Sequence, residues 1–407
     1  MIEREGLLLL AGELVPGRVR IEGAHIAAVE RLPSVPPDAP VLAPGLIDLH
    51  VHGYAGCDPE QDLSGMARAL AAAGTTAFLP TLFPDDPARL GRAAERIWKR
   101  RADDSLRGCA RMLGLHLEGP FVNPARAGGL PAERLHAPSP AALRALLGSS
   151  SADARGIRQV TVAPELPGAT ELIGELTQSG VRVSLGHSAA SAREAALAAE
   201  HGARGATHLF NAMGVGTTSG LHHREASLAS FALAEDALVA EIIGDLVHVG
   251  PEAFRIAVRA RGPLGLALVS DALKGANTRA TEFESHGRRC RVQGGAIWLE
   301  PDDPALPARL TGAEACQLEA VRRLVRADVI PLAQALTMAS ESPARALGLE
   351  RELGRLVQGA RADLIALDLR TLDLREVLVG GRAQANPRDD PTSRGAGDPD
   401  SGEAGRR

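Results

Sequence analysis

Short apolar runs alternate with segments of helical spacing along most of the chain. Between residues 45 and 272, eight apolar runs have the length of strands, and stretches rich in Ala, Leu, Arg and Glu separate most of them. Repeated units of strand and helix build parallel sheets, and eight such units close into a barrel. The pattern therefore predicts an α/β protein with a (β/α)8 TIM-like barrel. Its strands are expected at 46–52, 76–81, 111–118, 159–163, 181–187, 205–208, 239–243 and 266–271, with helices that include 65–73, 88–101, 191–201 and 251–261.

The two ends of the chain have a different pattern. Short strands punctuated by glycines are predicted at 7–10, 19–22, 25–30 and 41–42, and strand character returns between 354 and 381. We expect both ends to form one small β-sandwich domain. This divides the chain into residues 1–43 and 351–385 for the β-sandwich domain and 44–350 for the barrel.

Two further segments interrupt or follow the barrel pattern. Residues 275–310 are rich in turns and predict a hairpin, and helices are expected after it at 314–326 and 331–339. Residues 386–407 are mostly Pro, Gly, Asp, Ser and Arg, which are too polar to build a core. We therefore expect this tail to be disordered.

Composition narrows the class of protein. The net charge of -5 argues against a nucleic-acid surface, and an aromatic content of 2% argues against a platform of stacked rings. No stretch approaches the roughly 20 apolar residues of a transmembrane helix. The four cysteines form no C-x-x-C pair, which fits a reducing compartment. We expect a cytoplasmic protein with neither a nucleic-acid nor a membrane partner.

The first candidate for chemistry is a pair of histidines in the first predicted barrel strand. Side chains at alternate positions of a strand share a face, so His50 and His52 should project together. Asp48 lies one step earlier on that face and could orient a ligand. Two adjacent imidazoles are a good half-site for a divalent metal, but two strand histidines hydrogen-bonded to their neighbours would give the same pattern.

Four more candidates lie where later barrel strands end, at the face that carries catalysis in this fold. Each one alone has a structural explanation, as an acidic cap or a satisfied histidine. Together with the histidine pair they predict a divalent metal site, although such ligands accept Zn, Fe, Mn or Co. These residues are Glu118, His187, His208 and Asp271.

Longer motifs connect these residues to a known family. The run P-G-L-I-D-L-H-V-H at 44–52, followed by the later histidines and the final Asp, resembles the amidohydrolase superfamily, as does G-x-L-x-x-G-x-x-A-D-L at 354–364. Within that superfamily the chain closely resembles the N-acetylglucosamine-6-phosphate deacetylases from about residue 5 to 384. The motifs that carry this are G-L-H-L-E-G-P-F-x-N at 114–123, G-H-S at 186–188, T-H-L-F-N-A-M at 207–213, H-H-R-E at 222–225 and V-S-D-A at 269–272.

The resemblance implies an activity and a set of metal ligands. Such enzymes hydrolyse the acetamide of N-acetyl-D-glucosamine 6-phosphate to D-glucosamine 6-phosphate and acetate, in amino sugar catabolism. They are metal-dependent, with one or two ions per subunit. The resemblance implies Glu118, His187 and His208 as the principal ligands, and His50 and His52 as a pair that serves a second ion in some members only.

The resemblance also implies roles in proton transfer and substrate binding. Asp271 matches the catalytic acid/base, and His248 matches the histidine that polarises the acetyl carbonyl. Arg224 matches the residue that binds the substrate phosphate, contributed across the interface of a homodimer. Asn211 and Ala212 match positions whose donors approach that phosphate. The expected partner is a small-molecule amino sugar phosphate.

These roles are chemically consistent with one another. A bound divalent metal lowers the pKa of water towards about 7. Asp271 would take a proton from that water and deliver it to the departing amine, which is a poor leaving group unless protonated. His248 or the metal would stabilise the oxyanion, and the guanidinium of Arg224 would hold phosphate through two N–H groups.

The chain departs from the family pattern at four places. Leu130 stands where many members carry a phosphate-contacting histidine, and the 214–220 loop is longer and richer in Gly and Thr than expected. The usual D-G-x-H turn reads D-L-V-H at 245–248, and the Ser-rich loop before the last large helix is replaced by L-T-G-A-E-A at 310–315. The first three departures concern substrate recognition and leave the expected ligands intact.

Alternative functions differ in how well they fit. Relatives that bridge two metals with a carbamylated lysine are excluded, because neither Lys99 nor Lys274 lies near the end of the fourth strand, at 163–165. A deacetylase of another N-acetyl hexosamine, either N-acetylgalactosamine 6-phosphate or an unphosphorylated sugar, stays open. A non-catalytic scaffold with the same barrel is disfavoured, because every candidate ligand is retained.

Overall fold

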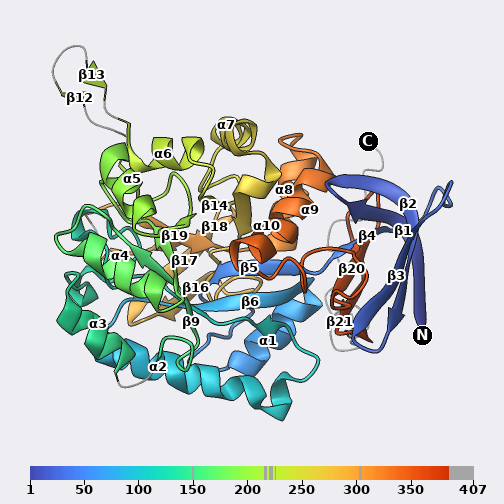
Figure 1. Cartoon of the computed structure of the whole chain (residues 1–407), viewed down its shortest axis with the longest axis horizontal. Coiled ribbons are helices and arrows are strands. Elements are labelled where there is room, and N and C mark those ends of the chain that lie inside the picture. Colours follow the sequence, from blue (N-terminus) through green and yellow to red (C-terminus); the bar gives the residue numbers. More distant parts are fainter. Residues whose placement is uncertain (149–150, 215–217, 220–222, 225, 302–304, 385–407) are drawn as a thin grey trace, which may run out of the picture.

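The predicted barrel is the centre of the computed structural model, which describes residues 1–148, 151–214, 218–219, 223–224, 226–301 and 305–384 (Figure 1). Eight parallel strands follow one another in chain order around it, and the first and last strands meet where Asp271 N donates to His50 O at 2.8 Å. The expected fold class is confirmed. The strands are β5 (Leu46–Val51), β6 (Thr75–Leu82), β8 (Leu115–Leu117), β9 (Ile157–Val162), β10 (Arg182–Leu185), β11 (Gly205–Ala206), β14 (Val239–Ile243) and β15 (Leu266–Val269); β7 (Arg111–Met112) pairs with β6.

Amphipathic helices surround the barrel (Figure 1). In α2, for example, Pro87 begins the helix after the capping side chain of Asp86, and Leu90, Ala94 and Ile97 lie on its buried face. The α-helices are α1 (Leu63–Ala72), α2 (Pro87–Lys99), α3 (Pro140–Leu147), α4 (Ala169–Gln178), α5 (Ala192–Glu200), α6 (Leu228–Ala234), α7 (Pro251–Arg261), α8 (Gln317–Arg326), α9 (Leu332–Ala339) and α10 (Glu341–Ala346). Short 3-10 turns are η1 (Arg100–Ala102), η2 (Asp104–Leu106), η3 (Pro124–Arg126), η4 (Ala132–Arg134) and η5 (Pro263–Gly265).

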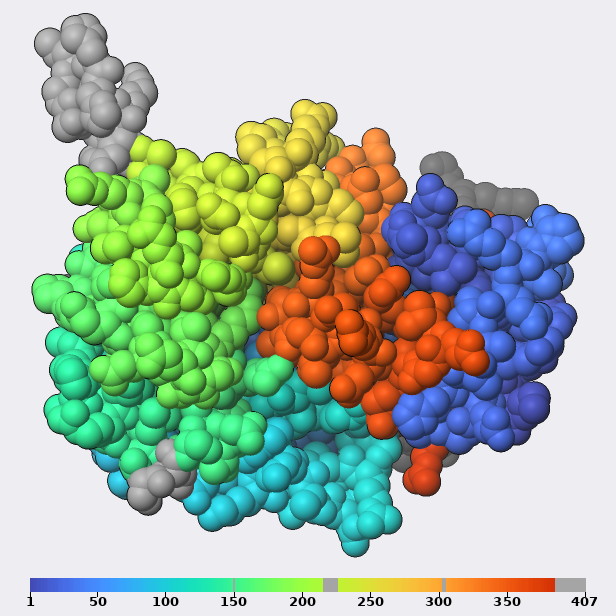
Figure 2. All heavy atoms as spheres, in the orientation of Figure 1, coloured from blue at the N-terminus to red at the C-terminus, as the bar shows by residue number. Residues whose placement is uncertain are grey.

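The two ends of the chain form one seven-stranded sheet beside the barrel, where the sequence predicted one small β-sandwich domain. Figure 2 shows the N-terminal and C-terminal segments packed against each other at one end of the molecule. β4 joins them, because it pairs with β1 in parallel and with β20 antiparallel. The sheet has its own apolar core, which includes Leu8, Ile21 and Leu364. In order across the sheet, the strands are β22 (Arg382–Ala383), β21 (Leu374–Val379), β20 (Leu364–Leu367), β4 (Val41–Pro44), β1 (Ile2–Leu10), β2 (Glu13–Glu22) and β3 (His25–Arg31).

Two insertions follow the carboxyl ends of barrel strands. The predicted hairpin at 275–310 is part of a four-stranded antiparallel sheet, and the turn after its first strand brings His286 to a ring-centroid distance of 4.2 Å from Phe83. A small hairpin, in which Arg224 pairs with Thr218, projects away from the barrel beyond α5 and α6 (Figure 1). The strands are β16 (Glu282–Ser285), β17 (Arg288–Gln293), β18 (Ala296–Leu299) and β19 (Arg309–Ala313) in the sheet, and β12 (Thr218–Ser219) and β13 (His223–Arg224) in the hairpin.

Two segments named in the sequence analysis lie wholly or mostly outside the described residues. The tail expected to be disordered, 386–407, lies outside the described residues, as does most of the 214–220 loop. Within the described ranges, no helix has the length and apolar character needed to cross a membrane.

Candidate metal centre

Three of the predicted ligands form a compact group, which we call the primary cluster: Glu118, His187 and His208. They follow β8, β10 and β11 and are 3%, 4% and 3% exposed. Glu118 Oε1 lies 3.0 Å from His187 Nε2 and 2.9 Å from His208 Nε2, and the two nitrogens are 3.0 Å apart. Ligands of a tetrahedral ion at about 2.0–2.1 Å are separated by about 3.3 Å, so these three atoms fit the edges of such a site.

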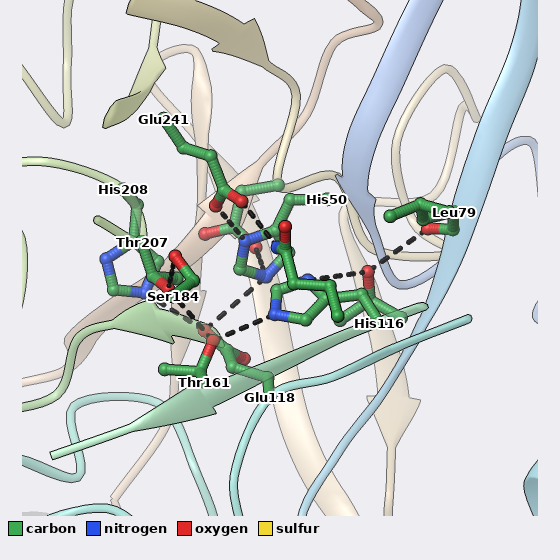
Figure 3. A network of polar contacts seen from close by, with 12 residues as sticks. His50, Leu79, His116, Glu118, Thr161, Ser184, Thr207, His208 and Glu241 are labelled. Atoms are coloured by element: carbon green, nitrogen blue, oxygen red, sulfur yellow. Dashed lines mark hydrogen bonds and ion pairs between the residues drawn. The ribbon is translucent and has the colours of Figure 1, made fainter. Parts of the chain in front are cut away.

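The second group, which we call the secondary cluster, consists of His50, His52 and the other oxygen of the shared Glu118. The Nε2 atoms of His50 and His52 are 3.3 Å apart, and His52 Nε2 is 3.1 Å from Glu118 Oε2. Asp271 Oδ1 lies 3.4 Å from His50 Nε2 and 3.6 Å from His52 Nε2. Figure 3 shows how Glu118 lies between His208 and His50. The arrangement can hold two ions with one bridging carboxylate.

The outer nitrogens of the four imidazoles are held in different ways. His187 Nδ1 lies 2.8 Å from the backbone oxygen of Arg126, and His50 Nδ1 lies 3.1 Å from Glu241 Oε2. Both contacts leave Nε2 free to bind a metal, because a neutral imidazole carries only one proton. In the described part of the chain, Nδ1 of His52 and of His208 is buried without a hydrogen-bond partner.

Without a metal, the charges of the clusters shift the titration of their own members. Burial lowers the pKa of His50, but the charges of Asp271 and Glu118 outweigh burial and place it well above the usual value. Burial also lowers the pKa of His208, and its contacts with Glu118 raise it above the usual value. Burial raises the pKa of Glu118, but His50 and His187 hold it well below the ordinary range. The carboxylates thus attract positive charge, which a divalent ion would supply in place of protons.

Asp48 contacts the backbone of His50, the residue that it was expected to orient. Its Oδ1 accepts the backbone N–H groups of His50 and Ser270, both at 3.2 Å, so it ties β5 to the end of β15. Burial raises the pKa of Asp48 to about 7, against the opposing effect of these hydrogen bonds. Asp48 therefore positions the backbone of His50, while the ring is held from β14.

Backbone strain marks the same set of positions. Residues with a side chain rarely adopt a positive φ, and such strain is concentrated at functional sites. Four predicted site residues at or after the ends of barrel strands have φ values between 31° and 51°: His187, His208, Ala212 and Asp271.

The predicted substrate-binding residues lie on the loops that follow these strands. His248 Nδ1 lies 2.6 Å from Asp245 Oδ2, and Asp245 also accepts two backbone N–H groups, so the D-L-V-H turn fixes the histidine ring. Asn211 N donates to His208 O at 3.0 Å, and Ala212 O accepts from Ser188 N at 3.1 Å. The backbone of Arg224 lies in β13, but its side chain is outside the described part of the structure. Leu130 packs into an apolar cluster with Val122 and Ala163.

Sequence reasoning missed the residues that support the ligands from behind. Glu241 lies inside β14 and is fully buried. The one indication in the sequence is an acidic residue within an apolar strand, V-A-E-I-I at 239–243. Glu165 follows β9 and accepts from Asn123 Nδ2 at 2.8 Å and Ser188 Oγ at 2.7 Å, so it joins two loops of the site. Neither role could be assigned from spacing alone, because the partners are far apart in the sequence.

The barrel and its clustered imidazoles and carboxylates define an α/β-barrel protein with groups that could hold a metal ion. The family model of the amidohydrolase family matches residues 41–392, and the chain belongs to this family. The family is metal-dependent, and groups able to hold an ion are present among the described residues. The resemblance noted in the sequence is therefore confirmed.

Individual relatives extend this comparison. The chain is 34% identical over 384 residues to an N-acetylgalactosamine-6-phosphate deacetylase of Escherichia coli O157:H7, which covers 92% of this chain and 97% of that protein. It is 34% identical over 332 residues to an N-acetylglucosamine-6-phosphate deacetylase of Bacillus subtilis, with 80% of each covered. A mutant N-acetyl-D-glucosamine-6-phosphate deacetylase from Mycobacterium smegmatis, solved with N-acetyl-D-glucosamine-6-phosphate, has a TM-score of 0.80 at 28% identity and covers 94% of this chain and 99% of that one.

Proposed function

We propose that this protein is a metal-dependent deacetylase that hydrolyses N-acetyl-D-glucosamine 6-phosphate to D-glucosamine 6-phosphate and acetate. The observation that carries the proposal is the meeting of two histidine groups on the single carboxylate of Glu118, with Asp271 Oδ1 within 3.6 Å of the secondary histidines. The names of relatives from several organisms support the same substrate. The four free cysteines accord with a cytoplasmic location, which we include in the proposal.

Metal binding is assigned to the two clusters. The donor set of imidazole nitrogens and carboxylate oxygens fits a divalent ion, and Zn, Fe, Mn or Co are all compatible with it. Glu118, His187 and His208 would hold the first ion, and His50 and His52 would hold a second ion together with Glu118. When bound, the metal lowers the pKa of a water and polarises a carbonyl.

The chain's own residues would supply the proton transfers. Asp271 would accept the proton of the attacking water and later deliver it to the amine, since an unprotonated amine leaves poorly. His248 is oriented by Asp245 through Nδ1, which leaves Nε2 as the nitrogen available to a substrate oxygen. An Nε2–H of this ring would donate to the oxyanion of the tetrahedral intermediate.

The phosphate would be bound by residues at two places in a homodimer. Asn211 and Ala212 lie three and four residues after His208, and Asn211 N donates to His208 O, so their donors would approach a substrate whose acetamide is at the metal. Arg224 lies in a hairpin that extends away from its own barrel, which favours a contribution to the site of a neighbouring subunit (Figure 1). A guanidinium suits this role because it can bind a phosphate through two N–H groups.

A second candidate substrate is N-acetylgalactosamine 6-phosphate. The E. coli relative that bears this name matches 92% of the chain, a larger share than the 80% matched by the B. subtilis relative. In addition, Leu130 is buried in an apolar cluster where a phosphate-contacting histidine was expected from the family. The coverage bears on the sugar, whereas Leu130 bears only on the phosphate that both candidates share, and neither observation changes the amide chemistry.

Acetate release from a panel of sugars tests the proposal. The panel contains N-acetylglucosamine, N-acetylgalactosamine and N-acetylmannosamine, each with and without a 6-phosphate, assayed with defined divalent metals. We expect the highest kcat/KM for N-acetylglucosamine 6-phosphate and a large preference for phosphorylated sugars. A higher value for N-acetylgalactosamine 6-phosphate would select the second candidate, and equal turnover without phosphate would contradict both.

A further inference from the structure

Glu241 lies behind the secondary cluster, on the side of His50 away from Glu118 (Figure 3), and it begins a row of hydrogen-bonded polar side chains. His50 Nδ1 is 3.1 Å from Glu241 Oε2, and Gln159 Nε2 donates to the other oxygen of Glu241 at 2.6 Å. Arg182 donates in turn to Gln159 Oε1. The row therefore crosses the barrel interior from β5 through β14 and β9 to β10.

Packing alone does not explain why these polar side chains are buried in the barrel. His50, Glu241 and Gln159 are all 0% exposed, and Glu241 occupies a position in β14 next to Ala240 and Ile242. Burying an ionised carboxylate in a barrel core is unfavourable unless it is paired and hydrogen-bonded, and an apolar residue would fill the same space without that cost. The carboxylate is therefore explained by what it does to its partner.

The effect on His50 follows from the chemistry of imidazole. A carboxylate accepts the Nδ1 proton, so the lone pair is on Nε2, which faces Glu118 Oε1 at 3.4 Å and His52 Nε2 at 3.3 Å. An imidazole held by a carboxylate is also a more basic ligand than one held by a neutral group. In the primary cluster, the corresponding partner of His187 is only a backbone carbonyl.

A cation bound directly by His50, His116 and Glu241 is a less suitable explanation, although these side chains lie close together. Both ring nitrogens of His116 already have threonine partners, at 2.8 Å from Thr161 and 3.5 Å from Thr81. The His116 ring is therefore satisfied by side chains of two neighbouring strands, β9 and β6.

We propose that Glu241 is the positioning residue that makes His50 a ligand for a second metal ion, and that Gln159 and Arg182 hold Glu241 in place. This inference rests on the metal-dependent function proposed above and extends it to residues that do not touch the ion. Arg182 is itself fixed by Val239 O at 2.8 Å and Arg204 O at 3.2 Å, so the row ends on the backbone of the barrel.

The test is a titration of the metal-free, full-length protein with Co2+ alone, followed by elemental analysis of bound ions and by visible absorption. Glu241→Gln keeps the shape of the side chain but offers His50 an amide in place of the carboxylate. We expect its second Co2+ to bind about 10- to 100-fold more weakly than in the wild type, with the first unchanged. Second-ion binding at wild-type strength would overturn the proposal.

Asp363→Asn is the matched control. Asp363 is also a buried carboxylate, bonded to Arg111 at 2.9 Å and to the Gly380 N–H at 2.6 Å, but it belongs to the terminal β-sheet. Both Co2+ ions should bind to this variant as they do to the wild type. Equal loss of the second ion in Asp363→Asn and Glu241→Gln would mean a general effect of removing a buried charge, and would also overturn the proposal.

A second variant keeps the test decisive if Glu241→Gln does not fold. Arg182→Gln retains the carboxylate but removes its support, so the second Co2+ should bind about tenfold more weakly, near the lower end of the range for such partners. The double variant should be no weaker than Glu241→Gln alone, because Arg182 acts through Glu241. If Arg182→Gln bound the second Co2+ as strongly as the wild type, the proposed role of Gln159 and Arg182 in holding Glu241 would be refuted.

The outcomes also separate this inference from the deacetylase function. A wild-type protein that binds one Co2+ yet releases acetate would overturn the role of Glu241 and leave the function standing. A protein that loses its second ion in Glu241→Gln, but releases no acetate from any sugar of the panel, would support the role of Glu241 and refute the function.

Discussion

The primary and secondary clusters share the carboxylate of Glu118, yet their outer supports come from different parts of the fold. His187 is held by a loop carbonyl, that of Arg126, whereas His50 is held by Glu241 from inside the barrel. The loop that contains Arg126 also lies against the His187 ring: a Cβ at Gly128 would be 3.6 Å from His187 Cε1, in van der Waals contact. The support of His50 is a buried charge, and that of His187 is a neutral peptide group.

The two clusters therefore show two ways of supporting the imidazole ring of a candidate metal ligand. A loop carbonyl fixes the imidazole tautomer at little electrostatic cost, and the loop can change with the substrate. A buried carboxylate strengthens the ligand but must be paired along a chain that reaches the far side of the barrel. The two clusters should therefore differ in their response to substitution, and the shared Glu118 should be the most sensitive position.

The largest effect is expected for Glu118→Gln, because this residue belongs to both clusters. The variant loses the charge that balances the histidines, so we predict that both ions are lost on dialysis. Without the metal, the transition state would lose several kcal/mol of stabilisation, so kcat/KM should fall by about 10³-fold or more. Elemental analysis measures the bound ions and acetate release measures the activity. If the variant kept both ions, Glu118 would not be the carboxylate that the two clusters share.

Asp271→Asn should separate chemistry from metal binding. The amide cannot accept a proton, so kcat should fall by about 10²- to 10⁴-fold while the primary ion remains. Steady-state kinetics and elemental analysis of the same sample provide the two readouts. If acetate release continued at the wild-type rate, Asp271 would not be the acid/base.

His52→Gln should affect the secondary cluster alone. His52 Nε2 contacts Glu118 Oε2, whereas the primary histidines contact Oε1, so the first ion keeps its ligands. We predict loss of the second ion and a fall in kcat/KM of about tenfold, equivalent to about 1.4 kcal/mol. His187→Gln is the matched variant of the primary cluster, and an equal effect of the two substitutions would remove the distinction between the clusters.

The smallest effect on metal binding is expected for Asp245→Asn, which removes the charged partner of His248 and leaves both clusters intact. Burial raises the pKa of Asp245, but the hydrogen bond and charge of His248 hold it below the usual value. A carboxyl group whose folded pKa is depressed stabilises the fold above its unfolded pKa of about 4, and this contribution disappears as pH falls through the folded pKa. The metal-free wild type should exceed the variant by about 1–3 kcal/mol in unfolding free energy at pH 7.

Denaturant unfolding at pH 7, 5 and 3 measures this difference. It should be smaller at pH 3 than at pH 5, since protonation of Asp245 makes the wild type resemble the variant. A difference that grows between pH 5 and pH 3 would show that the sign of the Asp245 contribution is wrong.

Most of the fold and the grouping of the candidate ligands could be predicted, because both depend on local pattern. The alternation of apolar strands and helices located all eight barrel strands, and the position of Glu118, His187, His208 and Asp271 at strand ends brought them to one face. The structure brings the candidate ligands together as that periodicity requires. The catalytic and metal-binding roles of these residues stay predictions.

The supports of the ligands could not be predicted because they depend on distant pairing. Glu241 meets His50 across 191 positions of sequence, and Gln159 meets Glu241 across 82. Asp48 shares a face with His50, as alternation requires, but its side chain binds backbone N–H groups of β5 and β15 instead of a ring. Only the closure of the barrel decides which side chains meet in its interior.

Metal-dependent release of acetate is the measurement that tests the account most directly. The full-length protein is stripped with a chelator, assayed with N-acetylglucosamine 6-phosphate, and assayed again after addition of a defined divalent ion. We predict no acetate from the stripped protein and, after metal is restored, equal amounts of acetate and glucosamine 6-phosphate. Acetate formed at the same rate with and without metal, or no acetate from the reloaded protein, would contradict the central claim.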